Sequence, residues 1–355
     1  VGGLSPSSFS NPELSWEKNN TLNLGVDIGF LENRFTLGVD VYRSVTRDLL
    51  LNVPIPVISG FSSTLQNIGK VENKGLEFEL GARVINTSDF SWRIDGNLSF
   101  NRNKVLELGP EGAPIPGFAR GTSVTITQIG SPIGSYFLIP VAGVFMTEEE
   151  LNSSPKSKTQ NVGDLKYVDT NEDGIITDDD KQIVGKNQPD FTWGLTQTIQ
   201  YKNFDLSIMA YGESGNHLLN ESQGGAGRSH VGNVLGYWRD RYVSTENPGD
   251  GKTPRAAVTS NLTTPSTFWL FDGSFWRIRN VSLGYNAPDV FLGNFRGAIS
   301  GLRVYLSAEN VFTKDNYFGN PQTGVRNNSL LVPGIDATNT YPLAKSLVLG
   351  LNITF

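Results

Sequence analysis

Apolar and polar residues alternate along most of this chain of 355 residues. In the segment 21–30, TLNLGVDIGF, every second residue is a large apolar one, and those between are small or polar. The last ten residues, SLVLGLNITF, follow the same pattern. A period of two puts alternate side chains on opposite faces of a strand. The pattern therefore predicts strands that have one apolar and one polar face.

The same alternation recurs in several further segments, which are 35–41, 74–84, 90–100, 191–201, 204–211 and 301–310. In 275–285, FWRIRNVSLGY, the phase changes, because Trp276 and Ile278 are out of step with Val281 and Leu283. An extra residue in one strand produces such a change, so we predict a β-bulge near Asn280.

Short and long connections alternate between these segments. The short ones are ENR (32–34), NTSD (86–89), SPIG (131–134), KN (202–203) and PDVFLGN (288–294). The long ones are 54–71, 105–121, 147–189, 219–271 and 314–341. Short turns on one side and long loops on the other are typical of outer-membrane barrels. If the last strand runs inward, all five short turns fall on the periplasmic side.

We therefore predict an all-β fold, a transmembrane antiparallel β-barrel with about eleven strands in this sequence. An open sheet in lipid leaves unpaired edges, so we expect further strands before Val1. A soluble β-sandwich also shows alternation and is the alternative. The long strands and the asymmetric connections favour the membrane.

Composition narrows the function. The chain has no cysteine, which excludes disulfides and thiolate zinc sites. Its net charge of −6, without a long basic run, disfavours nucleic acid as a partner. His217 and His230 lack clustered partners for a zinc site, and we expect both to be solvated. We find no catalytic constellation and predict that the protein is not an enzyme.

The segment 169–180, DTNEDGIITDDD, has the ligand spacing of an EF-hand calcium loop. Gly174 stands where the sharp turn occurs, and Asp180 replaces the usual bidentate glutamate. The predicted Ca²⁺ ligands are Asp169, Asn171, Asp173, the Ile175 carbonyl, Thr177 and Asp180. We expect a structural site that fastens the long extracellular loop 147–189. The alternative is an acidic turn that binds no metal.

Two further groups are candidate substrate contacts. Aromatic residues of the loops could stack on sugars, although girdle or packing roles are favoured; they are Tyr237, Trp238, Phe268, Trp269 and Phe271. Polar residues expected to face the barrel lumen could contact substrate or plug, although hydration of the interior is the default; they are Asp40, Glu77, Glu79, Arg93, Asp95, Arg303 and Glu309.

Longer strings give a family resemblance. The segments 11–51, GKVENKGLEFEL (69–80), GSPIGSYF (130–137), 163–195, YKNFDLSIMAYG (201–212), SFWRIRNVSLGYNAP (274–288) and 341–355 resemble SusC-like (RagA-like) TonB-dependent transporters. The match runs in family order along nearly the whole chain and is weakest at 219–271 and 314–330.

The resemblance implies a 22-stranded barrel with an N-terminal plug, of which residues 1–355 are the C-terminal half. It implies import of oligosaccharides, peptides or similar nutrients, driven through TonB. The implied partners are a SusD-like surface lipoprotein lid, membrane lipid and lipopolysaccharide, with transporter–lipoprotein pairs associating as a dimer. The implied location is the outer membrane of a Gram-negative bacterium.

Two alternatives remain at this point. One is a soluble, calcium-stabilised extracellular β-sandwich that binds glycans. The other is a transporter relative that serves as a scaffold in a larger surface complex. The sequence does not identify a substrate.

Overall fold

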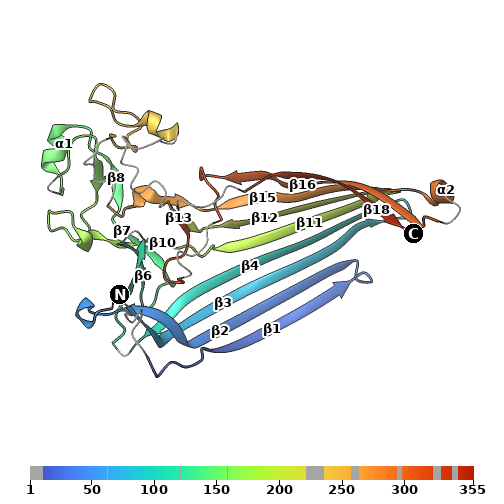
Figure 1. Cartoon of the computed structure of the whole chain (residues 1–355), viewed down its shortest axis with the longest axis horizontal. Helices are drawn as coiled ribbons and strands as arrows, with labels where there is room; N and C mark the ends of the chain where they lie inside the picture. Colours follow the sequence, from blue (N-terminus) through green and yellow to red (C-terminus); the bar gives the residue numbers. More distant parts are fainter. Residues whose placement is uncertain are drawn as a thin grey trace, which may run out of the picture.

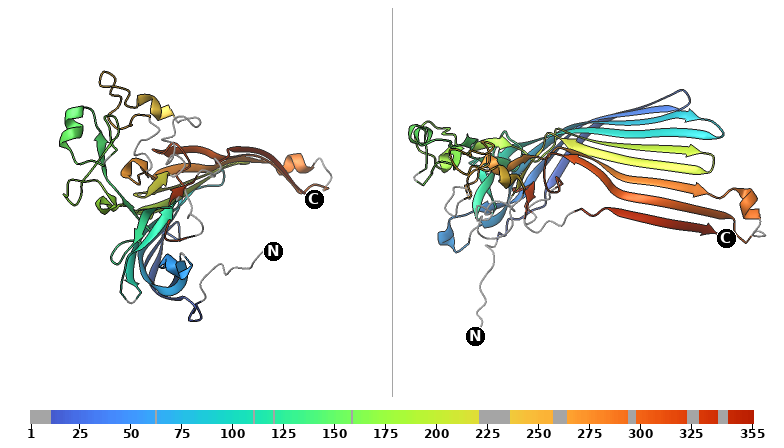
Figure 2. Two further views of the ribbon diagram at one scale, coloured as in Figure 1. Left: turned by 60° about the vertical axis from the view of Figure 1, so that its left-hand side comes forward. Right: turned by 90° about the horizontal axis from the view of Figure 1, so that it is seen from above.

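The computed structural model describes residues 11–61, 63–109, 111–119, 121–157, 159–220, 236–256, 264–293, 298–322, 329–337 and 343–355. Nine of its strands form one antiparallel sheet, in the order β1-β2-β3-β4-β11-β12-β15-β16-β18 (Figure 1). They are β1 (Lys18–Phe30), β2 (Phe35–Pro54), β3 (Ser63–Asn86), β4 (Phe90–Leu108), β11 (Phe191–Tyr201), β12 (Phe204–Ser214), β15 (Phe275–Asn286), β16 (Gly301–Asp315) and β18 (Ser346–Thr354). The sheet curves into an arc (Figure 2).

Tight connections gather at one end of this sheet, the end where the chain terminates (Figure 1). The turn after β1 takes left-handed φ angles at Leu31, Glu32 and Asn33, which lets Phe30 pair directly with Phe35. The turns 86–89 and 202–203 and the helix α2 (Asp289–Leu292) lie at the same end. Four of the five predicted short connections thus lie at one end of the sheet, as expected, although the last belongs to a longer link between Asn286 and Gly301.

The fifth turn and the strand count were wrong. Within the described residues the barrel sheet has nine strands instead of about eleven. SPIG joins β6 (Thr122–Thr127) to β7 (Ser135–Leu138) in a separate four-stranded sheet at the opposite end. Strand β4 pairs directly with β11, so 109–190 forms one excursion. A short turn between two strands has the same sequence signal in a cap sheet as in a barrel, and β7 packs into a local core, with Tyr136 and Leu138 both buried.

The described parts of the excursions 109–190, 215–274 and 316–337 gather at the end of the sheet opposite the tight turns and are here called the cap (Figure 1). Its elements are β5 (Ile115–Ala119), β6, β7, β8 (Val141–Val144), α1 (Glu148–Ser153), β9 (Leu165–Tyr167), η2 (Asp178–Asp180), β10 (Gln182–Gly185), β13 (His217–Asn220), η3 (Gly236–Asp240), η5 (Thr267–Trp269), β14 (Leu270–Asp272) and β17 (Ile335–Asp336). The buried core lies mostly here, around Tyr136, Leu138 and Ile139.

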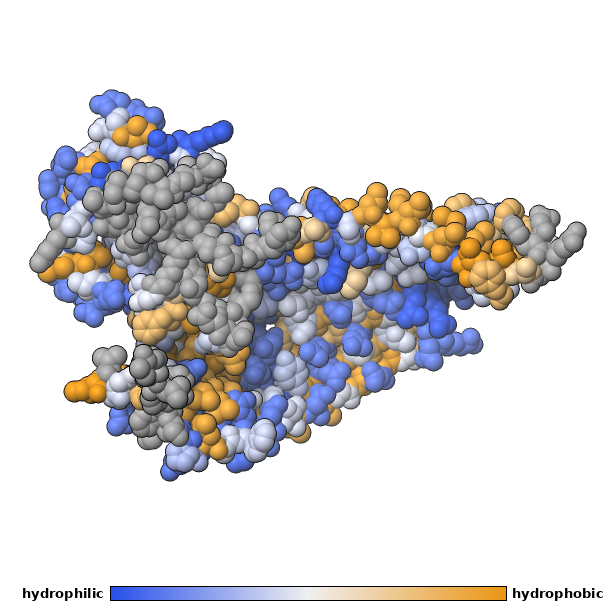
Figure 3. All heavy atoms as spheres, in the orientation of Figure 1, coloured by the Kyte–Doolittle hydropathy of each residue, from blue (hydrophilic) through white to orange (hydrophobic). Residues whose placement is uncertain are grey.

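The apolar face of the nine-stranded sheet is open. Leu24 and Leu349 are 72% and 76% exposed, and no described segment forms a second layer over this face. Hydrophobic surface extends along the strands toward the C-terminal end in Figure 3. A sandwich buries one face of each sheet, so the sandwich alternative is wrong and the barrel prediction is confirmed. Among the described residues, no helix has the length and apolarity needed to cross a membrane.

Aromatic pairs mark both ends of the apolar face. Phe90 contacts Tyr201 near the tight turns, and Phe100 contacts Phe191 near the cap, with ring centroids 6.4 Å and 5.9 Å apart. Strand β11 joins the two pairs through its 11 residues. A strand of that length, tilted by about 40°, rises roughly 25–30 Å, close to the ~25 Å band between the aromatic girdles of outer-membrane barrels.

The predicted bulge is present. The register of β15 against β16 and against β12 shifts between Ile278 and Asn280, so Arg279 is the extra residue. Arg277 and Asn280 consequently both face the polar side, where the Asn280 amide donates to Ser307 Oγ at 3.0 Å.

Candidate functional site

The polar face of the sheet borders an open hollow of about 710 Å³. Six neighbouring strands line it, from Asp27 on β1 to Met209 on β12. A hollow shared by six adjacent strands marks the concave face of the arc. In its wall Arg93 Nε and Nη2 donate to Asp95 at 2.7–3.0 Å. The hollow is large enough for a ligand of peptide or sugar size.

The predicted lumen residues share this polar face. Asp40 pairs across the strands with Glu77, whose carboxylate accepts a 3.1 Å hydrogen bond from Ser99. Arg303 donates to Asp205 at 2.6 Å, and Glu309 accepts from Ser346 at 3.1 Å. Glu79 and Asp95 line the hollow itself with Arg93.

Sequence reasoning missed Arg277, which lies on the polar face near the cap and is 3% exposed. Its guanidinium donates to Thr313 Oγ1 at 2.8 Å, Tyr211 Oη at 3.0 Å and Gln322 Oε1 at 2.7 Å. It also donates to Asn320 Oδ1 at 3.4 Å. Arg277 thereby fastens the segment after β16 to the barrel wall. The only sequence signal was an arginine at a polar position beside the bulge.

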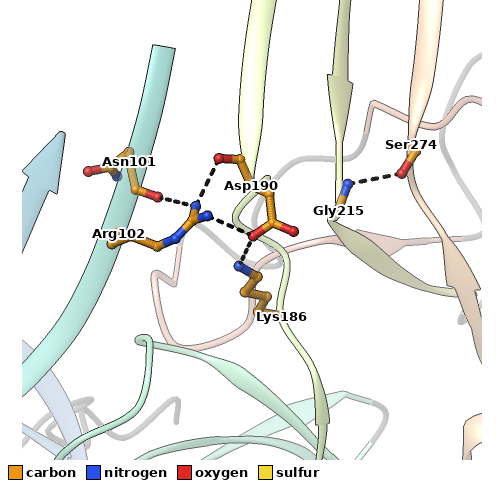
Figure 4. Close-up of polar contacts among 6 residues, drawn as sticks. All are labelled: Asn101, Arg102, Lys186, Asp190, Gly215 and Ser274. Atoms are coloured by element: carbon orange, nitrogen blue, oxygen red, sulfur yellow. Dashed lines mark hydrogen bonds and ion pairs between the residues drawn. The ribbon is translucent and has the colours of Figure 1, made fainter. Parts of the chain in front are cut away.

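The junction between cap and barrel depends on Arg102 of β4 (Figure 4). Its guanidinium donates to the Asp190 carbonyl at 2.8 Å and forms an ion pair with the Asp190 carboxylate at 3.3 Å. Lys186 Nζ lies 2.7 Å from the same carboxylate. These two cations keep the pKa of Asp190 below its ordinary value, the Lys186 hydrogen bond contributing most. The last residue before β11 is thereby fixed against β4.

The predicted loop aromatics form two clusters inside the cap. This agrees with a packing role, which we favoured over stacking on sugars. Trp238 and Trp269 are only 2% and 4% exposed. Phe268 contacts both, with centroids 6.4 Å and 4.7 Å away. Phe271 packs on Tyr317 at 5.3 Å, and Tyr237 joins the two groups by contacts with Trp238 and Phe318. Buried indoles cannot offer their faces to a sugar.

His217 departs from expectation. It belongs to β13, is half-buried, and its Nδ1 atom is buried without a hydrogen-bond partner in the described structure. It packs beside Gly185 rather than in solvent. His230 lies outside the described residues.

The segment 169–180 turns sharply, as its sequence predicts. Glu172 and Gly174 adopt left-handed φ angles of 60° and 85°. The Gly174 amide donates to Asp169 Oδ2, and the Ile175 amide donates to Asp173 Oδ1, both at 2.8 Å. These bonds wrap the backbone around the carboxylates.

Asp180 closes the loop. It is fully buried, and its two carboxylate oxygens accept from the Thr170 and Thr177 amides at 2.8 Å. With Thr177 it forms a capping box at the start of η2.

The donor chemistry of this loop fits Ca²⁺, which takes six to eight oxygen ligands. Carboxylate, amide, hydroxyl and carbonyl oxygens occur at all six predicted positions. Within the described part of the chain, no three acidic or histidine side chains converge into a ready-made metal cluster. The loop 169–180 therefore fits Ca²⁺ in the chemical type of its donor atoms and in the path of its backbone.

Known proteins resemble this chain throughout its length. The family model "TonB dependent receptor-like, beta-barrel" matches residues 2–311. The chain is 33% identical to TonB-dependent receptor P3 of Formosa agariphila, covering 100% of this chain and 36% of that protein. It is 31% identical to TonB-dependent receptor SusC of Bacteroides thetaiotaomicron, covering 99% of this chain and 33% of that one.

Among solved structures, that of the RagAB peptide transporter matches with a TM-score of 0.77 and 25% identity, covering 99% of this chain and 37% of that chain. The chain thus spans about a third of the length of the relatives it matches. The predicted SusC-like resemblance and an outer-membrane location are confirmed. This chain belongs to the TonB-dependent receptor-like β-barrel family.

Proposed function

We propose that the protein containing this chain imports nutrients through the outer membrane. The observation that carries the proposal is the pairing of an exposed apolar face with a polar hollow on the opposite face of the same sheet. Such a wall separates lipid from a water-filled path. The similarity to SusC and to the RagAB peptide transporter supports active import.

Oligosaccharides, peptides or related nutrients are the substrates we propose. The hollow offers carboxylates, a guanidinium and amides, the groups that hydrogen-bond both sugars and peptide backbones. Import needs no bond to be made or broken in the substrate, and we propose no enzymatic activity.

TonB and a SusD-like lipoprotein are the partners we propose. The cap presents a folded surface at the end of the barrel opposite the tight turns. This surface is where we expect the lipoprotein to bind as a lid. Association of two transporter–lipoprotein pairs would add a further interface.

Uptake in cells tests the proposal. The gene for the full-length protein is deleted. Uptake of fluorescent oligopeptides and oligosaccharides is then measured in the deletion strain and in the wild type, with and without a protonophore. We expect the deletion strain to lose uptake of one of the two nutrient classes and to regain it when the intact gene is restored. In the wild type, the protonophore should reduce uptake of that nutrient as much as the deletion does. Normal uptake by the deletion strain, with the protein found in a stable surface assembly, would instead favour the scaffold role.

We also propose that the segment 169–180 holds Ca²⁺ as a structural ion. The ligands are Asp169, Asn171, Asp173, Thr177 and Asp180, with the Ile175 carbonyl. Support comes from the donor types and from the left-handed turn at Gly174. Bound Ca²⁺ neutralises the acidic loop and restrains it within the cap.

A further inference from the structure

Three basic residues form a row across the outer face of the sheet. Arg43 of β2 pairs with Lys74 of β3, and Lys74 pairs with Arg102 of β4. Two residues closer to the periplasmic end of each strand, Val41, Leu76 and Phe100 pair in the same way. Alternate residues share a face. The three cations, here called the basic row, therefore lie on the lipid-facing side, directly beyond its apolar part.

An apolar groove of about 610 Å³ adjoins the basic row. Its walls are almost wholly carbon, and the row itself forms one border; the apolar lining residues are Leu22, Leu24, Val41, Leu76 and Phe100. The volume is in the range of small-molecule sites, about 300–1,000 Å³. A groove of this kind accepts a hydrocarbon chain.

The exposed charge beside the groove is positive. The side chains of Arg43, Lys74 and Arg102 are 58%, 58% and 57% exposed. Glu72, which accepts from Arg43 at 2.6 Å and lies 2.8 Å from Lys74, is only 7% exposed. Glu72 shares the face of Lys74 on β3, so its carboxylate lies beside the two cations and leaves their side chains mostly exposed.

The carboxylates in this cluster are outnumbered. Glu72 forms ion pairs with Arg43 and Lys74. Asp190 forms ion pairs with Arg102 and Lys186 (Figure 4). Four cationic side chains therefore share two carboxylates, and a net charge of about +2 remains for an external anion.

The depth of the basic row suits a lipid headgroup. Phe100 and Phe191 form the aromatic pair at the cap end of the apolar face, and aromatic girdles lie at the membrane interface. Arg102 follows Phe100 by two residues on the same face, one step outside that girdle. Lipid phosphates lie at this level, whereas acyl chains begin at the level of the paired residues Val41, Leu76 and Phe100 and extend toward the tight turns.

We propose that the basic row and its groove bind a phosphorylated lipid of the outer leaflet. The phosphate contacts Arg43, Lys74 and Arg102, and one acyl chain lies in the groove. The guanidinium groups of the two arginines suit bidentate binding, and Lys74 adds an ammonium charge. The proposal rests on the outer-membrane location and not on the import function, so either one can fail without the other.

Lipid binding by the full-length protein tests it. The protein is purified in a mild detergent, stripped of lipid, and titrated with bis-phosphorylated lipid A while the bound lipid is counted by native mass spectrometry. The test variant is R43Q/K74Q/R102Q. The control variant, K156Q/R239Q/K252Q, removes the same charge from the cap. We expect the test variant to bind roughly tenfold or more weakly, and the control to bind as the wild type does.

Two further measurements on the wild-type protein vary the lipid headgroup, and they test the proposal even if the triple variant folds poorly. Wild-type protein is titrated with dephosphorylated lipid A of the same acyl composition, and inorganic phosphate is added as a competitor. We expect the dephosphorylated lipid to bind at least several-fold more weakly, and inorganic phosphate at millimolar concentration not to displace lipid A. Equal binding of both lipids would overturn the phosphate contact. Displacement by inorganic phosphate would overturn the lipid as the occupant, and equal binding by both variants would overturn the basic row.

Discussion

The hydroxyl of Tyr136 on β7 donates to the carbonyl of Gly334, 2.9 Å away, and lies 3.1 Å from the carbonyl of His217. The three residues come from three separate excursions of the chain. Gly334 has a φ of 66°, and a Cβ atom there would lie 2.1 Å from the Tyr136 hydroxyl, so only glycine permits the contact. The buried Tyr136 side chain thus links the three excursions that form the cap.

Replacement of Tyr136 by phenylalanine should loosen this link. The change removes one donor from the Gly334 carbonyl, which keeps its bond from the Leu219 amide, and we expect the free energy of local opening of the cap to fall by about 0.5–1.5 kcal/mol. Hydrogen exchange of the full-length protein in detergent measures it. Amides of β13, including Leu219, which donates to Gly334 at 2.9 Å, should exchange faster, while the long strands keep their protection. Tyr201→Phe, on the exposed girdle, is the control, and equal protection in both variants would contradict the link.

Removal of the calcium ligands should expose the segment 169–180 to protease. We expect D169A/D173A to be cleaved there at the same rate with and without EGTA, whereas the wild type should become sensitive only in EGTA. D178A/D179A removes the same charge from positions outside the ligand pattern and should behave as the wild type does. Wild-type cleavage that is indifferent to chelator would show that hydrogen bonds alone hold the loop.

The cap should lose a local restraint in acid. The Lys166 ammonium, 2.8 Å from Glu150, and the Met146 amide hold the pKa of Glu150 below its ordinary value of 4.5. A carboxyl whose folded pKa is depressed stabilises the fold above its unfolded pKa and stops doing so as pH falls through the folded value. The effect should be less than about 1 kcal/mol, because both side chains are partly exposed.

Exchange of the α1 amides between pH 6 and pH 3.5, corrected for intrinsic rates, checks this restraint. In the wild type, protection of α1 should fall below pH 4.5. Glu150→Gln should be less protected at pH 6 and should show a smaller fall, while the exposed neighbour Glu149→Gln should follow the wild type. A fall of the same size in all three proteins would remove Glu150 as its cause.

Much of the barrel could be predicted because its constraint is local. In β1 and β18 each apolar residue faces outward independently of its distant neighbours, so the face of Leu24 or Leu349 can be read from the strand itself. The bulge was visible for the same reason, since a phase change lies within one strand. Donor spacing likewise identified the turn at Gly174.

The cap could not be predicted in this way, because its contacts join distant segments. Tyr136 stands beside Ser135 and Phe137 in the sequence, and nothing there shows that its hydroxyl contacts Gly334 and His217, nearly 200 and about 80 residues away. In the sequence Arg277 cannot be told from the other polar-face residues, because its partners Asn320 and Gln322 follow more than 40 residues later. The basic row was invisible because register places Arg43, Lys74 and Arg102 side by side.

Filling the polar hollow should block import without harming the barrel wall. Thr196 on β11 lines the hollow. Its neighbour Leu195 also borders the hollow, but it pairs with Gly96 and projects its side chain from the opposite face of the strand. We expect Thr196→Trp to reduce uptake of the transported nutrient by roughly tenfold, since an indole occupies much of the path beside Asp95, its cross-strand partner. Leu195→Trp adds the same bulk toward lipid, which tolerates aromatic residues, and should leave uptake close to normal. Surface labelling and heat-modified electrophoretic mobility confirm that both variants are assembled. If Thr196→Trp is assembled and transports as well as Leu195→Trp does, substrate does not pass along this part of the polar face.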